Sequence, residues 1–229
     1  MKIISKIILC ALLAPMVMLS SCNEDAPDNP QITTFMAFVT LTELNEKSCV
    51  FTTQEKDDSE LVTYTCEQTL DKQVFKTGER YLISFTNESN ERFKSGPIVF
   101  HGYQPIVSED AQIKAHSLIG SYMVDPINVA LVERSGTYIN LQATAPAMQN
   151  IKFGIYIDEA TAENAYPEAY VIYKSDNAAA SDKLFYGSFD LTPVWKKTTC
   201  KGINLHFNTS DGLKTEKFSK SVSGFEPAV

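Results

Sequence analysis

The chain has 229 residues, of which 44% are apolar, 10% aromatic and 21% charged. This balance is typical of a globular protein and excludes global disorder, collagen and a coiled coil. With 20 basic and 28 acidic residues the net charge is −8. That charge argues against nucleic acid as the main partner, because a phosphate backbone attracts a basic surface.

The N-terminal segment reads as a secretory signal that would be cleaved, residues 1–21. Lys2 and Lys6 precede an apolar run, 7–19, that is too short to span a bilayer comfortably. The run ends in Leu19-Ser20-Ser21-Cys22, which resembles a bacterial lipobox. This resemblance implies cleavage before Cys22, a diacylglyceryl group on its thiol, and acylation of the new amine by a fatty acid such as palmitate. Each buried methylene would contribute about 0.8 kcal/mol to membrane anchoring. The alternative is an ordinary cleaved signal with an incidental cysteine.

Residues 22–32 are expected to form an acidic tether. They contain three acids and two prolines without an apolar pattern, namely Glu24, Asp25, Pro27, Asp28 and Pro30. An acidic patch directly after the lipidated cysteine resembles the surface-export signal of Bacteroidota lipoproteins. It implies an outer-membrane lipoprotein exposed on the cell surface; the alternative is a solvated spacer on the periplasmic face.

Cys49 and Cys66 are predicted to face each other across a β-hairpin. Residues 48–53 and 61–66 read as strands around the turn 54–59. If the turn centres between positions 57 and 58, paired residue numbers sum to 115, so that Phe51 also lies opposite Tyr64 and Thr53 opposite Val62. An exported chain can keep a disulfide, and a bridge here would stabilise the fold by about 3 kcal/mol. The alternative is two buried free thiols.

The remaining cysteine, Cys200, is expected to be inert, because nothing near it in the sequence supplies a catalytic base. No C-x-x-C pair occurs in the chain. The spacing therefore suggests neither a zinc site nor thioredoxin-like chemistry.

Short strands with period two fill the first half of the mature chain. Five are expected, at 35–41, 48–53, 61–66, 80–86 and 97–103. In the fourth, Tyr81, Ile83 and Phe85 share one face. Five short strands in this length favour a small barrel, assigned to residues 33–107.

The strand pattern breaks over 108–121, where the domain junction is placed, and then resumes. Further strands are expected at 127–133, 138–142, 151–157, 169–173, 185–191, 203–207 and 214–219. The stretch 169–173 is apolar on both faces and so should be a central strand. Residues 159–164 could form one helical turn, and Asp211-Gly212 reads as a tight hairpin turn. These strands favour a β-sandwich over 120–220, followed by a loose tail, 221–229.

The order of these features resembles the NigD-like lipoproteins. The matching parts are the lipobox and acidic tether, the turn and strand 77–85, the hairpin 132–141, the strand 185–191 and the closing turn at Asp211-Gly212. The resemblance implies an all-β chain with an N-terminal OB-like barrel and a C-terminal β-sandwich. Its motifs are turns and strand patterns, so it transfers no catalytic residue. The family's suggested association is with bacteriocin loci, and Cys49, Cys66 and Cys200 are not part of its pattern.

No catalytic signature, cofactor motif or metal-ligand spacing is present. His101, His116 and His206 lie far apart, without a neighbouring ligand, and are expected to be structural or surface residues. Adjacent carboxylates occur at Asp57-Asp58, Glu109-Asp110 and Asp158-Glu159, where they suit solvated turns. A glycosidase pair instead needs carboxyl groups that face each other across roughly 5–9 Å. We therefore expect no catalytic residue, no cofactor and no metal.

Three function classes follow. The first is a non-enzymatic, lipid-anchored envelope protein that presents two β-domains to a protein partner or small ligand, with no role for nucleic acid. The second is a glycan-binding accessory lipoprotein, which predicts an exposed aromatic row drawn from Tyr103, Tyr138, Tyr166, Tyr170, Tyr173 and Trp195. The third is a hydrolase with dispersed catalytic residues, which predicts a cleft where a histidine meets an Asp, Glu, Ser or Cys.

Overall fold

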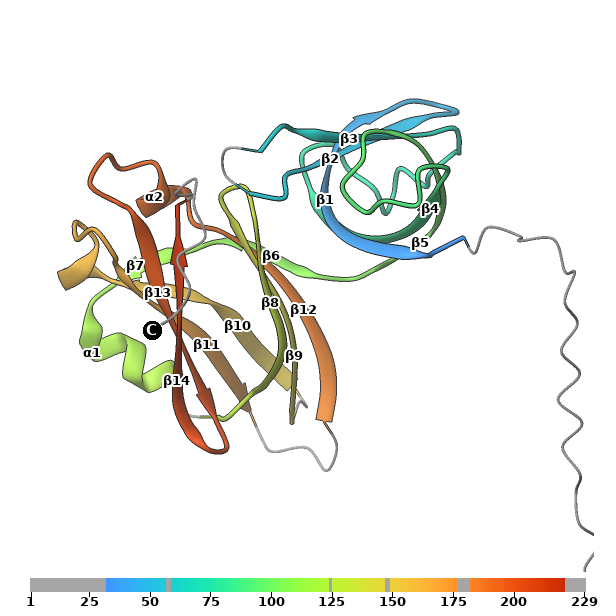
Figure 1. The fold of residues 1–229 in the computed structure, drawn as a ribbon. Helices are drawn as coiled ribbons and strands as arrows, with labels where there is room; N and C mark the ends of the chain where they lie inside the picture. Colours follow the sequence, from blue (N-terminus) through green and yellow to red (C-terminus); the bar gives the residue numbers. More distant parts are fainter. Residues whose placement is uncertain (1–31, 57–58, 124, 147–148, 177–181, 221–229) are drawn as a thin grey trace, which may run out of the picture. The chain divides into compact units, whose positions relative to one another are not determined.

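A computed structural model describes residues 32–56, 59–123, 125–146, 149–176 and 182–220 (Figure 1). All of these residues belong to one compact unit, Ile32–Val229. The expected signal peptide, nearly all of the acidic tether and the C-terminal tail lie outside this part. Within it, no helix is both long and apolar enough to cross a membrane.

The first part of the described unit is a closed five-stranded barrel. Its strands are β1 (Phe35–Leu44), β2 (Cys49–Thr53), β3 (Val62–Cys66), β4 (Arg80–Asn87) and β5 (Gly96–Gln104). They close in the order β1-β2-β3-β5-β4, with β3 and β5 parallel and the other pairs antiparallel. This is the strand order of an OB-like barrel, so the expected fold of the first domain is confirmed.

Alternation along the strands fills the barrel interior. Tyr81, Ile83 and Phe85 of β4 point into the core, as their shared face predicts. The opposite faces of β1 and β4 also carry buried side chains, because Phe38 and its cross-strand partner Leu82 are each only 3% exposed although neither belongs to the barrel core. The outside of this strand pair is therefore covered.

A β-sandwich follows the barrel (Figure 1). One sheet has the order β14 (Gly212–Ser219), β13 (Gly202–Thr209), β11 (Glu168–Asp176), β10 (Gln149–Asp158) and β7 (Gln112–Lys114). The other has the order β6 (Val107–Asp110), β12 (Asp182–Asp190), β9 (Tyr138–Pro146) and β8 (Asn128–Ser135). Four short helical segments complete it: α1 (His116–Ile119), η1 (Gly120–Tyr122), η2 (Glu159–Thr161) and α2 (Thr192–Trp195).

The inner faces of the two sheets form one core. Ile155 and Ile157 of β10 meet Leu141 and Phe189 of the facing sheet in that core. β11 lies in the middle of its sheet, which confirms the expectation from its two apolar faces. Gly187 in β12 leaves room for aromatic rings, because a Cβ there would lie 2.5 Å from a ring carbon of Phe189.

The expected pattern break at 108–121 contains two short strands. β6 pairs in parallel with β12, and β7 pairs in parallel with β10, so one continuous segment adds an edge to each sheet. Ala111 lies between the two strands, is buried, and donates its N–H to the carbonyl of Asp190 at 2.8 Å. Strands of three or four residues are too short to show a period, so the sequence did not predict them.

Candidate functional site

Arg80 lies at the start of β4 and joins the barrel to the sandwich. Its side chain emerges on the outer side of the barrel, next to its strand partner Thr40. Nε donates to Ser188 Oγ at 2.8 Å, Nη2 donates to Asn140 Oδ1 at 3.2 Å, and Nη1 donates to Thr40 Oγ1 at 3.3 Å. The guanidinium also stacks 3.9 Å above the ring centre of Tyr138. One side chain thus connects β1, β9 and β12.

The groups that contact the Arg80 guanidinium directly are polar and uncharged. The residue is 7% exposed, and burial lowers the pKa of its guanidinium to about 10, so it remains a cation at neutral pH. Within the described chain no carboxylate forms an ion pair with it. Its charge is therefore balanced by hydrogen bonds, by the π face of Tyr138 and by more distant acidic groups.

Two other contacts hold the barrel against the same sheet. Thr53 Oγ1 donates to the Phe38 carbonyl at 2.9 Å and lies 2.9 Å from Ser135 Oγ. Arg92 makes a two-point ion pair with Glu133, with N–O distances of 3.1 and 2.9 Å. Arg92 and Glu133 lie closer to solvent than Arg80, since their side chains are 31% and 20% exposed.

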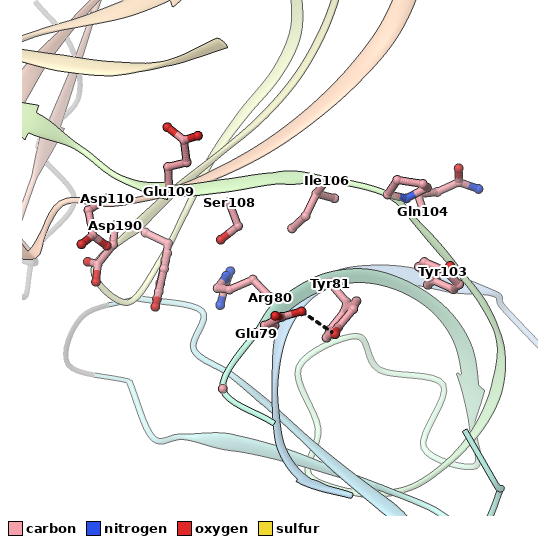
Figure 2. Close-up of a pocket in the computed structure, with 13 residues that line it drawn as sticks. Glu79, Arg80, Tyr81, Tyr103, Gln104, Ile106, Ser108, Glu109, Asp110 and Asp190 are labelled. Atoms are coloured by element: carbon pink, nitrogen blue, oxygen red, sulfur yellow. Dashed lines mark hydrogen bonds between the residues drawn. The ribbon is translucent and has the colours of Figure 1, made fainter. Parts of the chain in front are cut away.

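A pocket of about 480 Å³ opens beside Arg80 (Figure 2). The barrel contributes Glu79, Arg80, Tyr81 and Tyr103, and the segment after β5 contributes Ser108 and Asp110. The sandwich closes it with Tyr138 and Asp190. In Figure 2, Ser108 points toward Arg80 whereas Glu109 extends to the opposite side of its strand.

The carboxylates of the pocket make it acidic. Asp110 and Asp190 are directly paired across the parallel strands β6 and β12, and like charges in such a pair repel. Asp190 Oδ1 accepts the N–H of Thr192 at 2.8 Å, at the start of α2. On the barrel side, Tyr81 donates to Glu79 at 3.1 Å. In the described chain no third His, Cys, Asp or Glu converges with such a pair to make a metal-ligand group.

Ser188 and Tyr138, which contact Arg80 directly, are not arranged as activated nucleophiles. Ser188 Oγ accepts from Arg80 and donates to Asn140 Oδ1 at 2.7 Å, and an amide oxygen is not a general base. Burial, followed by the nearby Asp190, raises the pKa of Tyr138, so its phenol stays protonated at neutral pH. The arrangement offers hydrogen bonds, charge and ring faces to a bound group.

The three histidines lie outside this pocket. His101 is exposed, and its Nε2 lies 3.1 Å from the Thr86 hydroxyl. His116 Nδ1 lies 2.7 Å from Asp158 Oδ2. His206 contacts Glu168 through Nε2 and the Thr215 hydroxyl through Nδ1, the latter at 2.8 Å.

These histidine contacts bear on the hydrolase hypothesis. A hydrolase with dispersed catalytic residues would be rejected if no histidine had a carboxylate, hydroxyl or thiol beside it. Two histidines do lie within hydrogen-bond distance of a carboxylate, so the hypothesis is not rejected on that ground. Both lie on the outer face of the five-stranded sheet, where His206 is the strand partner of Thr215 on β14 and of Tyr170 on β11. The His206 ring stacks on Tyr170 with centres 4.6 Å apart. Cross-strand neighbours therefore account for the contacts of His206, whereas His116 lies on α1 and meets Asp158 at the end of β10.

The aromatic residues do not form the single exposed row that a glycan platform requires. Trp195 is only 4% exposed and belongs to the sandwich core, because α2 turns it inward. Tyr173 is likewise 2% exposed. Of the six candidates, the structure brings Tyr103 and Tyr138 to the pocket. A platform that includes Trp195 is thus ruled out by burial.

The cysteines fall into two groups. Cys49 and Cys66 are directly paired across β2 and β3, both about 1% exposed, which confirms the expected register. Cys200 is buried in the sandwich, where its thiol donates to the Gly202 carbonyl at 3.3 Å. All three are thiols in the structure. Cys22 lies outside the described residues.

Sequence reasoning missed Arg80, Asn140 and Ser188. Each alternates with apolar core residues, and such a position normally faces solvent. The one available signal was an arginine directly preceding the strongly apolar run of β4, and that pattern does not distinguish a domain contact from an exposed charge.

Three solved structures with the same fold come from Bacteroides species. A protein of unknown function from Bacteroides vulgatus is 18% identical, with a TM-score of 0.66 over 85% of this chain and 97% of that one. A NigD-like immunity protein from Bacteroides caccae is 16% identical, with a TM-score of 0.51 over 82% of this chain and 92% of that one. A protein from Bacteroides fragilis assigned as a lipoprotein is 10% identical, with a TM-score of 0.59 over 84% of this chain and all of that one.

At these identities the likeness establishes the fold. The resemblance to NigD-like proteins seen in the sequence is confirmed at that level. No protein-family model matches the sequence. No curated protein matches it significantly.

Proposed function

We propose that the protein is a lipid-anchored, non-enzymatic component of the cell envelope that binds a small ligand or a protein partner in the pocket beside Arg80. The pocket carries the binding part of this proposal, because it combines a buried cation, several carboxylates and tyrosine rings in about 480 Å³. The lipobox supports the anchor, and the likeness to a lipoprotein fold agrees with it. The proposal includes no cofactor, no metal and no nucleic acid.

The anchor is tested by replacing Cys22 with Ser. Serine cannot accept a thioether-linked diacylglyceryl group, so the variant should leave the membrane fraction, while wild type should yield an acylated N-terminal peptide by mass spectrometry. Retention of the variant, or an unmodified wild-type Cys22, would contradict anchoring.

Surface exposure is tested separately through the acidic tether. Replacing Glu24, Asp25 and Asp28 with their amides removes the charge and keeps the length. The triple variant should stay in the membrane fraction but lose its digestion by protease added to intact cells. Equal digestion of both proteins would favour a role for the tether as a spacer only.

The pocket is tested by recovering a partner from envelope extract. Tyr103 is 38% exposed, so Tyr103→Ala should fold normally and lose the partner. Val99→Ala is the matched control, since Val99 is exposed on the same strand but does not line the pocket. A partner retained equally by both variants would place binding elsewhere. A ligand recovered chemically changed would contradict the non-enzymatic part.

A glycan is the second candidate ligand. The observation that favours it is the meeting of Tyr103 and Tyr138 with carboxylates in one pocket, since tyrosine rings stack on sugar faces and carboxylates accept hydroxyl hydrogen bonds. It predicts that soluble envelope polysaccharide perturbs wild type but not Tyr103→Ala. The burial of Trp195 weighs against a broad aromatic surface for stacking sugars, so the glycan proposed for this pocket is a short segment.

A further inference from the structure

Two buried thiols are in contact in the barrel. Cys49 and Cys66 are direct partners in an antiparallel strand pair, both are about 1% exposed, and both belong to the barrel core. Direct partners in such a pair have Cα atoms about 4.5 or 5.5 Å apart, and both values suit a disulfide, which accepts roughly 4.4–6.8 Å. The backbone therefore need not move for the two sulfurs to bond.

We propose that Cys49 and Cys66 are joined by a disulfide in the exported protein, and that Cys200 stays a thiol. The proposal rests on the export part of the proposed function, because thiols persist in the cytosol and are oxidised in the envelope. It is independent of what the pocket binds.

The oxidant is a protein disulfide of the envelope's thiol-oxidising machinery. The thiolate of one cysteine attacks this disulfide and forms a mixed disulfide, and the second thiolate then displaces the carrier. The chain loses two protons and two electrons, and the carrier gains them as a dithiol. No oxygen or metal enters the balance.

The burial of Cys49 and Cys66 determines at which stage of folding this exchange can take place. Both thiols are inside the folded barrel, and burial followed by the neighbouring Cys66 raises the pKa of Cys49 to about 12. A protonated thiol is a poor nucleophile, and a thiol buried in the barrel core cannot reach the disulfide of a carrier protein. The exchange therefore precedes closure of the barrel, and the finished bridge is protected from reductants by the same enclosure.

Among the described residues, Cys200 has no cysteine as a strand partner. It packs in the core of the sandwich rather than the barrel, and its thiol is engaged by a backbone carbonyl. It serves as an internal reference thiol in any experiment on the pair.

The test is peptide mapping of the full chain after export in a host with an oxidising envelope. The purified protein is alkylated in denaturant without reductant and digested with trypsin. Cleavage after lysine gives separate cysteine peptides, 48–56, 57–72 and 198–201. We expect the first two to be disulfide-linked and the third to be alkylated; if cleavage after Lys56 fails, residues 48–72 should gain two hydrogen atoms on reduction.

Alternative outcomes overturn the proposal. Separate alkylated peptides carrying Cys49 and Cys66, or a peptide linking either of them to Cys200, would refute it. Membrane fractionation of the same cells shows whether the chain was exported, so failure of export is distinguished from failure of the bridge. Cys200→Ala should leave the linkage intact, while Cys49→Ala should make Cys66 alkylatable.

A stability measurement gives an independent readout. Breaking the bridge by reduction should raise the unfolding equilibrium constant of wild type roughly a hundred-fold, through the restored freedom of the unfolded chain. The same reductant should leave the Cys49→Ala variant unchanged. Equal responses of the two proteins would contradict a bridge.

Discussion

Two replacements of Arg80 distinguish what its hydrogen bonds contribute to stability from what the packing of its side chain contributes. Arg80→Met keeps a long side chain between barrel and sandwich but removes the charge and all donors. Arg80→Ala also removes the bulk. The pair of variants therefore asks whether this contact is held by polar bonds, by packing, or by both.

The expected magnitudes follow from the contacts. The bonds to Ser188 and Asn140, at 2.8 and 3.2 Å, contribute about 1.5 kcal/mol each, and the contact with Tyr138 adds roughly 1 kcal/mol. Desolvating the guanidinium costs several kcal/mol and offsets much of this gain. We expect Arg80→Met to lower the free energy of unfolding by about 1–2 kcal/mol, and Arg80→Ala by about 4 kcal/mol because a cavity is added.

Urea unfolding provides the assay, with Trp195 as a built-in probe. It is the chain's one tryptophan and lies in the sandwich core, so its fluorescence reports that domain while far-UV circular dichroism reports both. A shift of the midpoint at constant slope measures stability alone. Lys76→Met is the control, because it removes an exposed charge. Equal destabilisation by the Met and Ala variants, or a Met variant more stable than wild type, would refute the reasoning.

Two further predictions concern single buried positions. Gly187→Ala should lower the free energy of unfolding by about 2 kcal/mol, because the new Cβ would lie 2.5 Å from a ring carbon of Phe189. Gly154→Ala is the control, since its Cβ would meet no atom within 4 Å and should change thermal stability little. Equal melting points of the two variants would contradict this packing. Burial raises the pKa of Tyr64 to about 12 from its usual 10, so the folded phenol stays protonated while the unfolded one ionises, and stability falls as pH rises from about 10 to 12. Tyr64→Phe loses the hydrogen bond to the Arg92 carbonyl and should be about 1 kcal/mol less stable at pH 8, with the gap closing above pH 10; a gap independent of pH would exclude this ionisation.

The β2–β3 hairpin was predictable because local rules determine it. A short polar turn fixes which residues face each other, and the pairs Cys49–Cys66, Phe51–Tyr64 and Thr53–Val62 are all observed. The closing hairpin is also observed, although Ser210 and Asp211 form its two-residue turn and Gly212 is already the first residue of β14, one position from the expected turn. Such features depend on residues fewer than twenty positions apart.

The contact around Arg80 was not predictable for the opposite reason. Its partner Ser188 is 108 residues away in the sequence, and nothing local signals that the two will meet. Trp195 gave a misleading expectation, since aromatic content alone does not distinguish a core residue from a stacking surface. The prediction of the fold succeeded where periodicity sufficed, and the prediction of the site failed where burial depends on distant segments.

The last strand of the large sheet has consequences for crowding. Among the described strands, β14 has a single sheet neighbour, β13, so its outer N–H and C=O groups can pair with another chain. Lys214, Glu216 and Lys217 are exposed along it, and charged side chains on such a border discourage pairing between copies. On the lipid surface proposed above, where copies are concentrated in two dimensions and collide frequently, this charged border would disfavour edge-to-edge pairing between neighbours.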